Sequence, residues 1–69
     1  MNAMGLSPQS VELVNNMERK LLDDRAKLDT LREHYGPTHP DVQELFRGIN
    51  NAEQHIAAYQ NSLNAQMNQ

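Results

Sequence analysis

The chain has 69 residues, a formal net charge of −3 and no cysteine. This length allows one small domain, and the absence of cysteine excludes disulfides and thiolate metal sites. The mild acidity argues against nucleic acid as a partner. No apolar run is long enough to cross a membrane, so we expect no direct membrane contact from these residues.

Residues 1–6 carry no helical or strand pattern. Within them, Asn2-Ala3-Met4 resembles the residues that expression vectors leave before a target's own first residue. We expect residues 1–6 to be disordered or vector-derived, and the whole chain to be a fragment of a larger protein.

A first helix is expected over residues 8–35. Ser7-Pro8 has the form of an N-cap followed by proline at the first helical position. The apolar residues that follow recur in the steps of a heptad pattern, with one polar interruption at Asp24. The same steps end at Tyr35. The predicted seam residues of this helix are Val14, Met17, Leu21, Leu28 and Leu31.

A turn is expected at residues 36–39. Gly36 suits the left-handed residue that ends a helix, and Pro37 cannot continue one. Thr38, with Asp41 three residues later, has the form of a capping box for the next helix. The predicted turn motif is Tyr35, Gly36, Pro37, Thr38, His39, Pro40, Asp41 and Val42.

The second helix is expected over residues 40–63, with a frayed Asn/Gln-rich tail over 64–69. Its apolar residues alternate steps of three and four without a break. They are Val42, Leu45, Ile49, Ala52, Ile56, Tyr59 and Leu63. Two amphipathic helices joined by a short turn pack antiparallel, so the sequence predicts an all-α, two-helix coiled-coil hairpin.

The helical pattern leaves two registers open. In the first, Leu31 lies opposite Val42 and Met17 opposite Ile56; in the second, Leu31 lies opposite Ile49 and Met17 opposite Leu63. Asp24 falls in an apolar layer in both. It is expected either to lean out to solvent or to fix the register, with Arg25 or His55 as its partner.

The sequence predicts neither an enzyme nor a cofactor or metal site. His34, His39 and His55 do not fall at the spacing of one helix face that zinc sites use. No nucleophile elbow, phosphate-binding glycine loop or paired carboxylate site is present. We therefore expect a structural or binding role.

Two large apolar residues, Leu22 and Phe46, lie outside both predicted seams. A hairpin this short has only one seam to bury and is marginal on its own. We expect Leu22 and Phe46 to be oligomer contacts, with a homo-oligomer as the result.

One family resemblance covers the middle third of the chain. A helix ending in Leu-x-x-Leu-Arg, then Tyr-x-Pro-x-His-Pro-x-Val and a second coiled-coil helix, resembles the periplasmic coiled coil of polysaccharide co-polymerases. The matching residues are Leu28, Leu31, Arg32, Tyr35, Pro37, His39, Pro40, Val42 and Leu45. The resemblance implies a periplasmic segment of a bacterial inner-membrane protein that controls exopolysaccharide chain length. It also implies partners in the rest of that membrane-anchored protein.

Two other resemblances leave a protein-binding module as the alternative. His39-Pro40-Asp41 is similar to the tripeptide of the J domains of Hsp70 co-chaperones. Gly36, His39, Pro40 and Val42 resemble the turn between tetratricopeptide repeats of the kinesin light chain type. Each implies a fragment that binds another protein.

Overall fold

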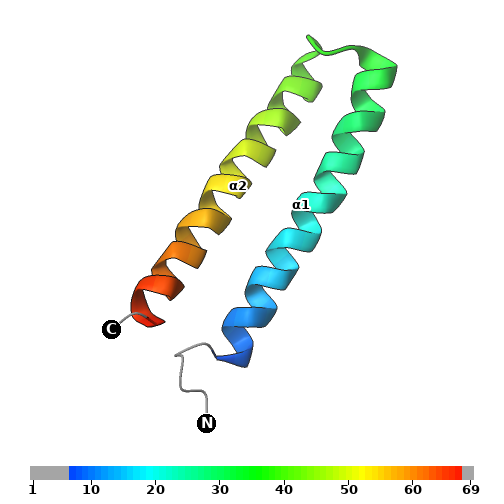
Figure 1. Ribbon diagram of the computed structural model, residues 1–69. Coiled ribbons are helices and arrows are strands. Elements are labelled where there is room, and N and C mark those ends of the chain that lie inside the picture. Colours follow the sequence, from blue (N-terminus) through cyan, green and yellow to red (C-terminus); the bar gives the residue numbers. More distant parts are fainter. Residues whose placement is uncertain (1–6, 68–69) are drawn as a thin grey trace.

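The computed structural model describes residues 7–67, and these form an all-α helical hairpin. Helix α1 spans Pro8–Tyr35 and helix α2 spans Pro40–Met67. The two helices run antiparallel along their whole length, so α1 begins and α2 ends at the same end of the molecule (Figure 1). The molecule is a rod with principal extents of 50 × 17 × 11 Å. The fold class predicted from the sequence is confirmed.

Helix α1 begins where Ser7 supplies a cap. Ser7 has extended backbone angles, φ −83° and ψ 156°, and its Oγ accepts a hydrogen bond from the Ser10 N–H at 3.1 Å. Pro8 then occupies the first helical position, where its missing N–H leaves no bond unmade. The helix ends at Tyr35, as its pattern predicts, because Gly36 leaves the helical conformation at φ 85° and Pro37 has no N–H to donate to a helical hydrogen bond.

Helix α2 continues past its predicted end. The sequence placed a frayed tail from residue 64, but the helix runs to Met67. No glycine or proline follows Leu63, and alanine and glutamine are good helix formers. The helical backbone hydrogen bonds therefore continue beyond Leu63. Residues 68–69 and 1–6, for which a frayed tail and disorder were expected, lie outside the described residues.

The core is a thin strip between the two helices. Within residues 7–67 the buried apolar side chains are Leu28, Val42, Ile49 and Ile56, each at most 7% exposed. Three of them come from α2, whose apolar series is unbroken. Leu21, Leu31 and Leu45 pack against the cluster that Leu28, Val42 and Ile49 form. The tightest packing therefore lies in the half of the hairpin nearest the turn.

The contacts between the helices select the first of the two registers. Met17 and Leu21 of α1 line one shallow hollow together with Ala52 and Ile56 of α2. At the far end, the Tyr59 hydroxyl lies 3.5 Å from Ser10 Oγ. The second register would place Tyr59 beside Leu21, about 16 Å along the helix from Ser10 at 1.5 Å per residue. The short turn thus sets Leu31 opposite Val42.

The remaining predicted seam residues, Val14, Met17, Leu21, Leu31, Leu45, Ala52, Tyr59 and Leu63, are all half-buried. Tyr35 behaves differently and is 57% exposed. In the observed register the residue opposite it is Thr38, which belongs to the turn. With no α2 residue to cover it, the Tyr35 ring packs against His39 instead, with ring centroids 4.9 Å apart.

Candidate functional site

The turn between the helices is built around Gly36. This glycine has φ 85° and ψ 162°, a conformation that residues with a Cβ rarely adopt. Its N–H donates to the Arg32 carbonyl at 2.9 Å, and its own carbonyl accepts from the His39 N–H at 3.4 Å. Pro37 occupies the second position of that turn, which suits its fixed φ. Gly36 is required here by backbone geometry, not by space, since no atom lies within 4 Å of where its Cβ would be.

His39 caps helix α2. Its Nδ1 accepts a hydrogen bond from the Asp41 N–H at 3.1 Å, and its carbonyl accepts the first helical bond, from the Gln43 N–H at 3.0 Å. The predicted capping box at Thr38 and Asp41 is therefore wrong. Because Pro40 is the first helical residue, the cap position falls on His39, and Thr38 lies one residue too early.

His39 also belongs to a small group of rings at the turn. Besides its contact with His39, the Tyr35 ring meets His34 edge to face, at a centroid distance of 6.4 Å. Asp41 lies in the first turn of α2, where a negative charge is stabilised by the helix dipole. The turn motif is thus accounted for as a connector: each of its polar residues with a described contact caps a helix or packs on a neighbour.

The three histidines are spread along the hairpin. His34 and His39 lie near the turn, while His55 lies near the middle of α2. Among residues 7–67 no three His, Asp or Glu side chains come together as a potential ligand set. The described part of the chain also contains no helix long and apolar enough to span a bilayer.

Asp24 lies in the apolar layer beside Ile49, but neither predicted partner binds it. Its Oδ2 lies 3.0 Å from Lys20 Nζ, one turn earlier on the same helix. The Asp24 side chain is 18% exposed, and that of Lys20 is 76% exposed. The carboxylate therefore reaches the edge of the seam, where a flexible lysine meets it. Such a pair contributes a few tenths of a kcal/mol.

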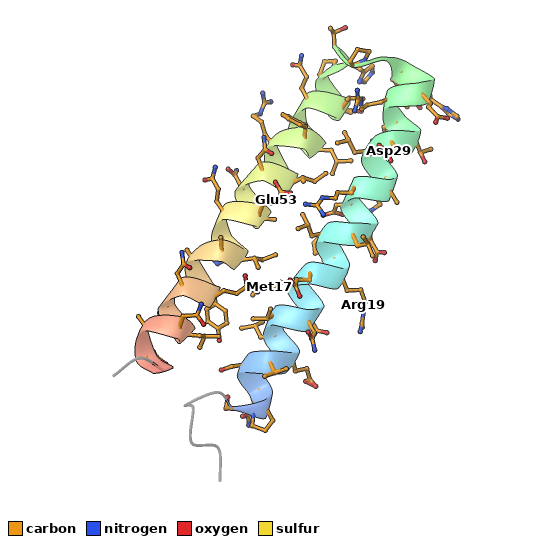
Figure 2. All side chains as sticks on the ribbon, viewed as in Figure 1. Met17, Arg19, Asp29 and Glu53 are labelled. Atoms are coloured by element: carbon orange, nitrogen blue, oxygen red, sulfur yellow. The ribbon has the colours of Figure 1, made fainter. Side chains whose placement is uncertain are left out.

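Arg25 instead forms an ion pair with Glu53 of α2, across the seam. Figure 2 shows Glu53 on the side of α2 that faces α1, and Met17 pointing into the same interval. The sequence prediction missed this pair. A signal was available: Arg25 and Glu53 each follow a seam position by one residue. In antiparallel coiled coils these flanking positions face each other.

One face of the hairpin is hollowed at Gly48. Apolar side chains of Met17, Leu21, Ala52 and Ile56 form the floor of this hollow, with Lys20, Asp24 and His55 at its rim. The hollow exists because Gly48 and Ala52 are too small to cover the seam. No atom lies within 4 Å of a Cβ built on Gly48.

Several large apolar side chains outside the seam remain exposed to solvent. Leu22 is 65% exposed and Phe46 is 52% exposed, so both predicted oligomer contacts are accessible. Val11 and Leu13 are exposed by nearly half near the start of α1.

Comparison with known proteins gives no relative: no family model, no curated protein and no solved structure matches this chain.

Proposed function

We propose that this chain is a non-catalytic structural element, a coiled-coil hairpin through which a larger protein assembles. The observation that carries the proposal is that the hydrophobic core is small for the length of the two helices. Two helices of 28 residues each share four buried apolar side chains. A core in a chain of this size rarely supplies more than about 3–5 kcal/mol.

The polar residues support a structural role. Ser7 and His39 cap the starts of the two helices, the Lys20–Asp24 ion pair lies within α1, and the Arg25–Glu53 ion pair joins α1 to α2. The hollow at Gly48 is shallow and open, and its surface is mainly apolar, formed by Met17, Leu21, Ala52 and Ile56.

As the parent of this hairpin we propose a polysaccharide co-polymerase, the bacterial inner-membrane class that sets exopolysaccharide chain length. The support is the turn motif, in which Tyr35, Pro37, His39, Pro40 and Val42 resemble that family's coiled coil. A hairpin also suits insertion into a larger domain, because its two open ends lie together (Figure 1). In this proposal the segment is periplasmic and its partners are copies of itself and the rest of its parent.

A cellular experiment tests this function. Three chromosomal variants are compared: deletion of residues 8–67, Leu28→Asp, which places a charge in the core, and Gly48→Ala, which preserves the fold. The extracted polysaccharide is sized by gel electrophoresis. We expect a shifted or lost length distribution for the first two variants and an unchanged one for Gly48→Ala. An unchanged length distribution in all three would rule out the co-polymerase role.

A further inference from the structure

We propose that copies of the hairpin pack side by side and point the same way, with Leu22 of one copy inserted into the hollow at Gly48 of the next. This inference rests on the proposed self-association and specifies its interface. Leu22, at 65%, is the most exposed large apolar side chain of residues 7–67. The hollow at Gly48 offers it an apolar floor. A second copy of the chain therefore supplies both halves of the contact.

Leu22 and the hollow lie on opposite faces of the hairpin. On an α-helix, the residue before Leu21 and the residue after it point to opposite sides of the seam. Lys20, before it, lies at the rim of the hollow, so Leu22, after it, lies on the other face. We call the face of Leu22 the front and the face of the hollow the back. Leu22 can enter the hollow of another copy when the front of the first packs on the back of the second.

Leu22 and the hollow also lie at the same height along the rod. The observed register, with Leu31 opposite Val42, places Leu21 level with Ala52, which belongs to the floor of the hollow. Leu22 is one residue, about 1.5 Å, closer to the turn. Two hairpins that point the same way, without a shift along the rod, therefore bring Leu22 to the hollow.

The charges of the two faces match in this arrangement. From the open end towards the turn, the front of α1 has the signs minus, plus, minus, plus, at Glu18, Arg25, Asp29 and Arg32. At the corresponding heights the back has the signs plus, minus, plus, minus, at Lys20, Asp24, Lys27 and Asp41. The two members of each pair differ in height by at most about 3 Å in the observed register. Asp23 and Glu44 lie farther from the seam, at the outer edges of the back.

The same arrangement covers two further apolar side chains near the open end. Val11 lies on the front and is 47% exposed, and Leu13 lies on the back and is 46% exposed. Their heights differ by two residues, about 3 Å, so Val11 of one copy meets Leu13 of the next. The apolar contacts and the charges thus agree on one alignment.

Other arrangements of two hairpins bring like charges together. Inverting one copy about Leu22 would place Arg25 beside Lys20 of the other copy. Packing two fronts about a twofold axis along the rod would place Glu18 at nearly the height of the other copy's Glu53. Front-to-back packing avoids both conflicts, and it keeps the open ends of all copies at one end, as parents anchored in one membrane require (Figure 1). The contact is heterologous, so a dimer forms first and further copies can add to its free faces.

A disulfide experiment tests the contact, because the chain has no cysteine of its own. Closely packed helices bring facing Cα atoms within the range that disulfides bridge. An equimolar mixture of Leu22→Cys and Gly48→Cys should therefore give a covalent dimer under mild oxidation. Two controls should remain largely monomeric on a non-reducing gel: Leu22→Cys alone, and Leu22→Cys mixed with Ser62→Cys, a back position about 16 Å closer to the open end. Equal or greater cross-linking in either control would overturn the proposed interface.

A charge experiment tests the alignment at Asp29 and Lys27, neither of which forms an ion pair within residues 7–67. Asp29→Lys alone and Lys27→Asp alone each place like charges across the interface. Each should weaken association by roughly three- to tenfold in sedimentation equilibrium. The double variant, with both substitutions in one chain, restores opposite charges between copies and should recover most of the loss. Circular dichroism checks that each variant remains helical. If the double variant associates no better than the single ones, the front-to-back alignment is wrong.

The outcomes separate this inference from the proposal on which it rests. If the unsubstituted chain sediments as a monomer at all concentrations, self-association itself is refuted. If it associates but the mixture of Leu22→Cys and Gly48→Cys does not cross-link above the controls, only the front-to-back interface is refuted.

Discussion

Replacing Leu28 with alanine tests whether the observed seam stabilises the hairpin. Leu28 is 7% exposed, lies opposite Leu45 and belongs to the cluster with Val42 and Ile49. The substitution removes three carbons from this environment, and at about 0.8 kcal/mol per buried methylene this amounts to roughly 2–3 kcal/mol. Buried leucine-to-alanine substitutions usually lower the free energy of unfolding by about 2–5 kcal/mol. We expect a loss in the lower part of this range, because a two-helix core can partly collapse around the cavity.

The assay is urea denaturation followed by circular dichroism, with Leu22→Ala as the matched control. Leu22 lies on the same helix and carries the same side chain, but it is 65% exposed. At concentrations too low for association, Leu22→Ala should change the free energy of unfolding by less than about 0.5 kcal/mol. If Leu28→Ala cost no more than Leu22→Ala, Leu28 would not be a core residue and the seam would be wrong.

Substitutions at three further positions distinguish the contribution of the turn from that of the helices. Gly48→Ala should stabilise the hairpin by about 1 kcal/mol, because alanine is the better helix former and no atom lies within 4 Å of the new Cβ. Gly36→Ala should destabilise it by roughly 1–3 kcal/mol, because φ 85° strains any residue with a Cβ; a neutral result would mean that the turn relaxes freely. His39→Ala should cost about 1 kcal/mol through loss of the α2 cap, while His39→Asn retains an acceptor for the Asp41 N–H and should recover most of that loss. Thermal melts monitored by circular dichroism measure all three.

The sequence was sufficient for both ends of α1, for the start of α2 and for the presence of a turn between them. Ser7-Pro8 and Gly36-Pro37 each combine a capping residue with a proline, and these pairs mark the start and end of α1. The heptad steps identified the residues that face the other helix, because burial against a single partner permits only one apolar stripe per helix. The all-α hairpin follows from these two signals.

The helix register, the residue that caps α2 and the partner of Asp24 could not be predicted from the sequence, because each depends on contacts in the folded structure. Both registers matched apolar residues, and the choice required the geometry of the turn and the contact between Tyr59 and Ser10. Thr38 is the better intrinsic cap, but Pro40 as first helical residue places the cap at His39. Asp24 forms its ion pair with Lys20, one turn away on the same helix, because the long lysine side chain can reach it there. The link to polysaccharide export remains a prediction, since it depends on a turn motif alone.

In the proposed assembly, this hairpin completes the burial of its apolar side chains by associating with a second copy. Sedimentation equilibrium combined with circular dichroism melts, over at least a hundredfold range of concentration, tests it most directly. We predict a helical dimer at high concentration and a melting temperature that rises with concentration, because association stabilises the folded state by mass action. A fully helical monomer whose melting temperature does not depend on concentration would contradict the claim.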